Sequence, residues 1–261
     1  MKEWYVMEDN TSALELSFLM GTLLLQNGAE ISRVQDTMER VVKAYNVDEF
    51  CAYVITNGIF ANGVENGVSK HTAIQYVKTS SIHFGRIAAL NQLSREICAG
   101  KLSVSDAFEV AHKIKDIPYT KDWLMILASG ISCAGFCYVF GGTIRDTIAA
   151  FIVGLIVQAF LSATDKISMG KITSNLLASA IATIGAIFFL KINLGQNLDY
   201  IIAGSLIRLV PGVALTTAIR DFLNSDYLSG TIRIVDVIIV GGCIAIGAGV
   251  IVKLASMLAI L

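Results

Sequence analysis

The residue most clearly suited to binding chemistry is Arg208, which lies midway along an apolar stretch long enough to cross a membrane. Placing an unpaired guanidinium at bilayer depth costs about 2.5–3.5 kcal/mol, so such side chains usually face a bundle interior or a wet cavity. Pro211 and Gly212 follow, and proline removes a backbone donor and interrupts a helix. An interrupted helix beside a cation suits a carboxylate ligand. We therefore predict an anion site at Arg208, Pro211 and Gly212; the alternative is a structural ion pair with Asp236 or Asp146.

Four polar residues follow in the same stretch: Thr216, Thr217, Arg220 and Asp221. Thr216 and Arg220 are four residues apart, as are Thr217 and Asp221, so each pair shares a helix face. This spacing predicts a polar mouth to the anion site, with the threonines as substrate ligands and the charged pair in gating. For Arg220 and Asp221 the alternative is solvated charges at a helix end.

Two further carboxylates are candidates for proton coupling. Asp165 ends one apolar stretch and Asp236 begins another. Desolvation of either group would raise its pKa and allow it to carry a proton, whereas solvation at the membrane interface would leave it an ordinary acid. Gln158 lies on a helix face of small residues and is either a polar substrate ligand or part of a helix–helix hydrogen bond.

Motifs for metal, nucleotide or hydrolytic chemistry are absent from the sequence. The histidines are widely spaced, the cysteines lack metal-type spacing, and no phosphate-binding loop, dinucleotide fingerprint or nucleophile elbow occurs. We therefore expect no metal, no cofactor and no catalytic residue. The net charge of −1 gives no reason to expect a nucleic-acid partner.

The second half of the chain supplies the elements that would hold these residues in a lipid bilayer. A spanning helix needs about 20 mostly apolar residues. Stretches of about this length occur at 123–140, 147–163, 175–194, 198–219 and 234–252. Small residues recur every fourth position within several of them, which favours close helix packing. The distribution of Lys and Arg between the loops favours a cytosolic N-terminus.

The first half has the pattern of a soluble domain. Capping residues and apolar periodicity predict helices near 13–26, 31–45, 87–97 and 104–114. Aromatic and β-branched residues predict strands at 50–56 and 71–79, with Asn-Gly turns at 57–58, 62–63 and 66–67. The predicted fold is therefore an α-helical polytopic membrane protein with about five transmembrane helices in 121–261, preceded by a small α+β cytosolic domain in 1–120.

Three segments resemble the threonine/serine exporter family and occur in the family's order. Residues 27–34 (NGAEISRV), which include Gly28, Glu30 and Arg33, resemble its N-terminal signature. Residues 209–221 (LVPGVALTTAIRD), continuing to 228–230, resemble its membrane signature, and 91–103 also fits. One departure is Thr217, which stands where the family motif is expected to have Asn. If that side chain contacts substrate, specificity would differ.

The resemblance implies an efflux transporter of the bacterial inner membrane. It would be an antiporter driven by the proton gradient. Its substrates would be small amino acids such as threonine and serine, or C4-dicarboxylates such as succinate. It also implies a larger subunit of a split system that works with a small multi-span membrane protein, and an oligomer is expected. Two other classes stay open: a membrane-tethered enzyme, and a regulatory scaffold with activity in the soluble domain. Against the enzyme, the soluble half has no nucleophile–base or metal spacing.

Overall fold

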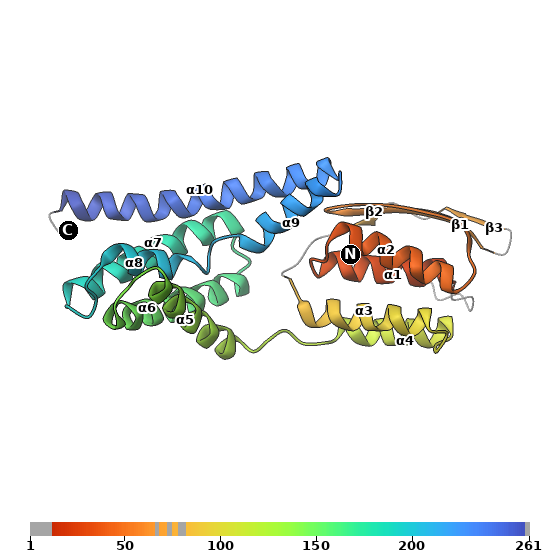
Figure 1. Cartoon of the computed structure of the whole chain (residues 1–261), viewed down its shortest axis with the longest axis horizontal. Coiled ribbons are helices and arrows are strands. Elements are labelled where there is room, and N and C mark those ends of the chain that lie inside the picture. The colour runs from red at the N-terminus through yellow and green to blue at the C-terminus, as the bar shows by residue number, and fades with distance from the viewer. Residues whose placement is uncertain (1–11, 66–67, 72–74, 78–81, 259–261) are drawn as a thin grey trace. The chain divides into compact units, whose positions relative to one another are not determined.

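Residues 12–65, 68–71, 75–77 and 82–258 are described by the computed structural model (Figure 1), and the chain divides into two compact units. Unit 1 comprises the residues up to Tyr119 together with Ile219–Ile232. Unit 2 comprises Thr120–Ala218 and the residues from Arg233 onward. The segment Ile219–Ile232 therefore groups with the first unit, although it follows most of the apolar stretches in sequence.

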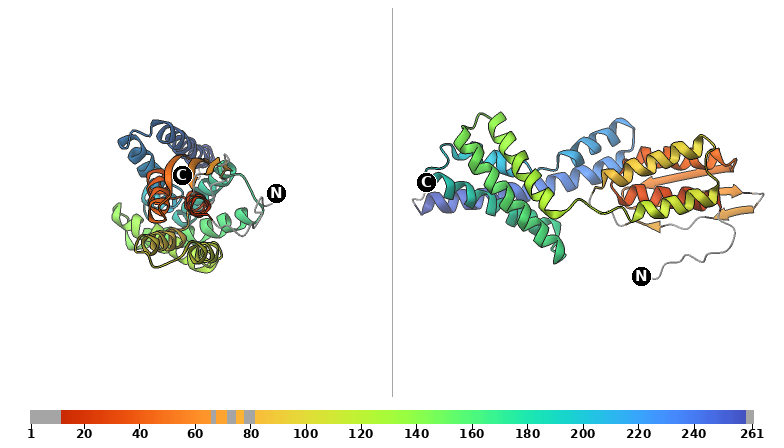
Figure 2. Two further views of the ribbon diagram at one scale, coloured as in Figure 1. Left: turned by 90° about the vertical axis from the view of Figure 1, so that its right-hand side faces the viewer. Right: turned by 90° about the horizontal axis from the view of Figure 1, so that it is seen from below.

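Unit 1 is built in layers, which Figures 1 and 2 show from different sides. A four-stranded antiparallel sheet has the order β1-β2-β3, and β4 also pairs with β2. The helices α1 and α2 pack on this sheet, and α3 and α4 pack on them. The helices are α1 (Ala13–Gln26), α2 (Ile31–Ala44), α3 (Phe84–Cys98) and α4 (Val104–Lys115). The strands are β1 (Asp48–Ile55), β2 (Gly58–Glu65), β3 (Val68–His71) and β4 (Gln75–Tyr76).

Local sequence explains where α1 begins and ends. The Ser12 hydroxyl accepts a hydrogen bond from the Glu15 backbone N–H at 3.2 Å, so the predicted N-terminal cap is confirmed. Gly28 follows the helix with φ of +79°, a conformation that side chains rarely adopt. A Cβ on Gly28 would also lie 2.9 Å from Ile82, so two constraints favour glycine at this turn.

One part of the sheet differs from the prediction. Asn62 and Gly63 were expected in a turn, but they lie inside β2, opposite β1 and β3. A Cβ on Gly63 would lie 2.6 Å from Leu14 Cδ2, so this glycine allows α1 to approach the sheet closely. The expected turn at 66–67 and most of the expected strand at 71–79 lie outside the described residues.

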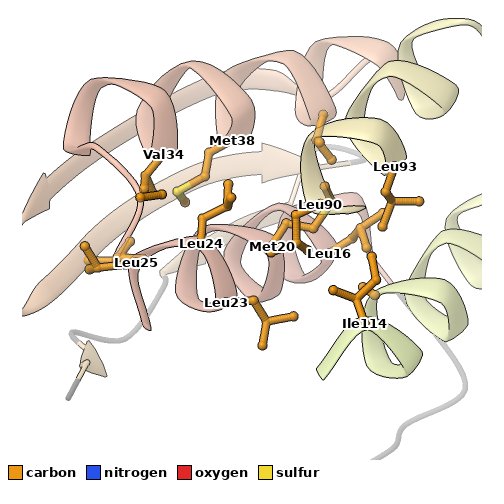
Figure 3. Packing of buried hydrophobic residues seen from close by; sticks show 14 of the residues in the cluster. Leu16, Met20, Leu23, Leu24, Leu25, Val34, Met38, Leu90, Leu93 and Ile114 are labelled. Atoms are coloured by element: carbon orange, nitrogen blue, oxygen red, sulfur yellow. The ribbon is translucent and has the colours of Figure 1, made fainter. Parts of the chain in front are cut away.

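The core of unit 1 joins its helices and sheet. Apolar side chains from α1, α2, α3 and α4 interdigitate in Figure 3, among them Leu16, Met20, Met38, Leu90 and Leu93. Each of these five is at most 1% exposed. Burying one such side chain contributes about 1.5–3 kcal/mol. This core fixes the helix ends that carry the polar residues of unit 1.

Unit 2 is helical, and its long helices match the predicted membrane stretches. Four helices of the described chain are long and apolar enough to cross a membrane. They are α5 (Asp122–Val139), α6 (Ile144–Lys166), α7 (Lys171–Lys191) and α10 (Tyr227–Met257). The remaining predicted stretch, 198–219, is divided between α8 (Leu198–Leu206) and α9 (Gly212–Leu223). The expectation of about five membrane helices thus becomes four long helices and one interrupted pair.

Small residues bring several of these helices close together. The row Ser174, Ala178, Ala182 and Ala186 of α7 is buried, as its spacing predicts. In α10, Gly241 and Gly249 are also four-residue-spaced small positions, but a Cβ on either would meet nothing within 4 Å in the part of the chain that the structure describes. The close contact of α10 is made at Gly247 instead, where a Cβ would lie 2.1 Å from Ser179 Oγ and 2.4 Å from the Leu176 carbonyl oxygen.

Candidate functional site

The break between α8 and α9 is a short non-helical link that contains Arg208. Backbone hydrogen bonds from Leu209 N–H to Leu206 O and from Val210 N–H to Ile207 O form turns after α8. The helix resumes where the Leu215 N–H donates to the Pro211 carbonyl at 3.0 Å. Proline has no N–H and cannot continue the preceding helix, so the interruption falls where the sequence places Pro211.

Arg208 is held in this link by a neutral partner. Its Nε donates to Gln158 Oε1 of α6 at 3.0 Å. Gln158 is 3% exposed, and its Nε2 donates to Ser162 Oγ at 3.4 Å. Two predicted site residues, one in α6 and one in the link between α8 and α9, are thus brought into contact. Because the partner is an amide, the positive charge of the guanidinium is not neutralised by this contact.

The ion pairs considered for Arg208 are not formed. Asp236 pairs instead with Lys171 Nζ at 2.6 Å. Asp146, which is fully buried, accepts from the Thr143 backbone N–H and hydroxyl and from the backbone N–H groups of Gln196 and Asn197 at 2.6–2.9 Å. Asp146 therefore ties the loop before α8 to the start of α6. Within the described residues, the other guanidinium nitrogens of Arg208 make no hydrogen bond, and the residue is exposed on the single chain.

The structural role of Asp146 was not predicted from the sequence, although a local pattern indicates part of it. Thr143 and Asp146 form a capping box, in which each side chain bonds the backbone N–H of the other. The spacing Thr-x-x-Asp before an apolar run could have identified the box. The additional bonds to Gln196 and Asn197 join residues about fifty positions apart, and no local pattern predicts them.

The polar residues after the break take several different contacts. The hydroxyls of Thr216 and Thr217 donate to the Val213 carbonyl of their own helix at 3.0 and 2.7 Å. Arg220 forms an ion pair with Glu30, and this hydrogen-bonded carboxylate raises the pKa of Arg220. Asp221 is only 3% exposed. The alternative of a solvated helix-end charge is therefore wrong for Asp221, whereas Arg220 is exposed to solvent as well as paired with Glu30.

The predicted acid at the end of α6 is placed differently from the one in α10. Asp165 is exposed, and its neighbour Lys166 pairs with Asp122 at 2.9 Å. Asp236 is about half exposed and paired with Lys171, which links α10 to the start of α7. Of the two proton-coupling candidates, only Asp236 joins two long helices.

The N-terminal signature residues meet the membrane signature within unit 1. Gly28 forms the turn before α2, and Glu30 is the N-cap residue of that helix and binds Arg220. Arg33 lies one turn into α2 and lines a polar groove together with Glu30. The ion pair joins segments 190 positions apart in sequence.

The described residues contain no group of three or more His, Cys, Asp or Glu side chains that could hold a metal ion. A second hollow, of about 690 Å³, lies in unit 2 between α8 and α10. It is lined mainly by apolar residues together with Asp199 and Lys253, and Arg208 is not among its lining residues.

Comparison with known proteins identifies relatives that match most of the chain. The ThrE family model, described as "Putative threonine/serine exporter", matches residues 15–255. A Mycobacterium tuberculosis protein named "Probable threonine/serine exporter" is 21% identical over 236 residues, which cover 90% of this chain and 44% of the relative. This chain thus spans less than half of that protein's length.

Two shorter relatives match over most of both chains. The "Probable succinate transporter subunit YjjP" of Escherichia coli is 23% identical over 238 residues, covering 87% of this chain and 88% of the relative. The protein of the same name from Klebsiella aerogenes is 23% identical over 211 residues, covering 80% and 81%. No solved structure matches the chain. The family model spans both units and the signature segments, and the chain belongs to the threonine/serine exporter family of membrane transporters.

Proposed function

We propose that this chain is a subunit of a secondary exporter for small carboxylates, either threonine and serine or C4-dicarboxylates such as succinate. The observation that carries the proposal is the hydrogen bond from Arg208 to the neutral Gln158 at the interrupted helix. A guanidinium held by an amide keeps its charge for an incoming anion. Arg binds carboxylates well because its planar fork donates two parallel hydrogen bonds.

The helix ends on either side of Arg208 support the same reading. The C-terminal end of α8 carries partial negative charge, and the N-terminal end of α9 carries partial positive charge. A substrate carboxylate would be stabilised by Arg208 and by the start of α9 at Gly212. The ammonium group of an amino acid would be stabilised by the carbonyl groups that end α8. Thr216 and Thr217 lie in the following turn and would line the path to this position.

Transport requires that the site open alternately to the two sides of the membrane. In other transporters, rocking of helices around a fixed mid-membrane site achieves this. We propose that Asp236 couples the movement to protons, because its protonation would remove the ion pair with Lys171 and loosen the contact between α10 and α7. Asp165 is the second candidate for this role.

A partner subunit is the remaining part of the proposal. Two relatives are named as transporter subunits, and Arg208 is exposed on the single chain. A small multi-span membrane protein that covers this position would exclude lipid from the guanidinium. The soluble unit would lie in the cytosol and the assembly in the bacterial inner membrane.

The proposal is tested by export of labelled threonine, serine and succinate from cells that express the chain with and without a co-encoded small membrane protein. Arg208→Gln is expected to lower export at least about tenfold, the effect of losing one charge-assisted hydrogen bond. Pro211→Ala is expected to lower export as well, because alanine supplies the backbone N–H whose absence helps to interrupt the helix. Arg145→Gln is the matched control, because Arg145 is exposed at the start of α6. Export at the parent rate by both site variants would refute the assignment of the site.

A further inference from the structure

Unit 1 contains a polar groove that the proposed transport site does not use. The groove has a volume of about 610 Å³, within the usual range for small-molecule sites. It is lined by one face of α2, one face of α3 and Asn224 of the segment 219–232. Charged and hydroxyl side chains line it, among them Arg33, Thr37, Ser94 and Arg95.

The charges in this groove leave an excess of positive charge. Both acids are already paired, Glu30 with Arg220 and Asp36 with Arg40 at 2.9 Å. Arg33 forms no ion pair or hydrogen bond within the part of the chain that the structure describes.

Arg95 is the second guanidinium whose charge no carboxylate meets. Its Nε donates to the neutral Gln92 Oε1 at 3.0 Å, and the Gln92 amide in turn donates to Glu96. The groove therefore presents Arg33 from α2 and Arg95 from α3 without a directly bound acid. Two such cations match the two negative charges of a dianion better than the zero net charge of an amino acid.

Two hydroxyl side chains of the groove add hydrogen-bonding groups to the two arginines. Thr37 is 4% exposed and Ser94 is 6% exposed, and both line the groove. Neither side chain has a hydrogen-bond partner among the described residues. Both hydroxyls line the groove and are available to hydrogen-bond a molecule bound there.

We infer that this groove is a binding site for a small dicarboxylate, held by Arg33 and Arg95 and by the hydroxyls of Thr37 and Ser94. The choice of a dicarboxylate rests on the proposed function, whereas the site itself rests on the groove and its unpaired groups. The site would load or sense the exported acid on the soluble unit, next to the Glu30–Arg220 ion pair, separately from Arg208.

The test is calorimetric titration of the full chain in nanodiscs with succinate, threonine and inorganic phosphate. All measurements use an Arg208→Gln background, which removes the proposed transport site. Succinate is expected to bind with saturation, and both threonine and phosphate are expected to bind at least about tenfold more weakly. Arg33→Gln and Arg95→Gln should each raise the Kd for succinate about tenfold or more. Thr37→Val, which conserves volume, should raise it severalfold.

Lys113→Gln is the matched control, because Lys113 is an exposed cation of α4 outside the groove, and its Kd should equal that of the background. A thermal melt of each variant checks that it is folded. Three outcomes would overturn the inference: no succinate binding in the background, an unchanged Kd for both arginine variants, or equally tight binding of phosphate or threonine. Arg33-dependent binding in the background, together with no export by the parent chain, would refute the proposed function alone. Export by the parent chain, together with no binding in the background, would refute the groove alone.

Discussion

Arg208 and Gln158 meet through one hydrogen bond, and the neutrality of the acceptor determines what the guanidinium can do next. A carboxylate at position 158 would satisfy the charge permanently and compete with substrate. The residues themselves were recognisable in the sequence, because Arg, Pro-Gly and a Gln within apolar stretches are each unusual. Their contact was not, because it joins α6 to the link between α8 and α9, fifty positions further along the chain.

Gln158→Glu should therefore reduce export at least about tenfold, since an ionised partner would bind Arg208 more strongly than an amide by more than ~1.4 kcal/mol. Ser162→Ala removes only the weak 3.4 Å contact of the Gln158 amide and should leave export close to the parent rate. The measurement is efflux of labelled substrate normalised to the amount of protein in the membrane. Parent-rate export by Gln158→Glu would show that a free charge on Arg208 is not required.

At the scale of helices and strands, the sequence predicts elements whose boundaries depend on local chemistry. Capped helices such as α1 and the interruption at Pro211 follow from neighbouring residues. Strand β2 was missed because Asn62-Gly63 has the composition of a turn, whereas Gly63 serves the approach of α1 to the sheet. Which small residues of a membrane helix face a neighbour is also decided by tertiary packing, and in α10 this is Gly247.

Gly247→Ala should therefore disturb the contact between α10 and α7. Its Cβ would lie 2.4 Å from the Leu176 backbone oxygen, which cannot move as a side chain can. Overpacking of this kind costs about 1–3 kcal/mol. Gly249→Ala is the control two residues away, where a Cβ meets nothing within 4 Å. Thermal unfolding in detergent should show a lower midpoint for the first variant only, and equal midpoints would contradict the packing described.

At the scale of the whole molecule, the protein family could be predicted from the sequence, whereas the contacts between distant segments could not. The long apolar helices and the family signatures gave the membrane transporter, and the family match bears this out. The ion pair between Glu30 and Arg220 and the placement of 219–232 in unit 1 depend on long-range packing. No periodicity or motif spacing carries that information.

Coupling between proton and substrate is a property of the assembled transporter. Asp236→Asn should alter stability by less than about 1 kcal/mol, because the pair with Lys171 is half exposed. Its export should nevertheless no longer fall when an uncoupler collapses the proton gradient. Asp122→Asn removes an ion pair of similar exposure, with Lys166, and its export should keep the uncoupler sensitivity of the parent. If Asp236→Asn also keeps that sensitivity, Asp236 is not the coupling residue.

Because unit 1 contains two separate segments of the chain, it cannot be produced as one continuous fragment. The polypeptide leaves one unit for the other after Tyr119, again after Ala218 and again after Ile232, and both α9 and α10 begin in one and end in the other. A fragment cut at residue 120 would lack Arg220 and Asn224. Its groove would lose the lining residue Asn224, and Glu30 would lose its ion-pair partner. Such a fragment is a poor surrogate for the native soluble part, and a faithful one would need the 219–232 hairpin grafted back onto it.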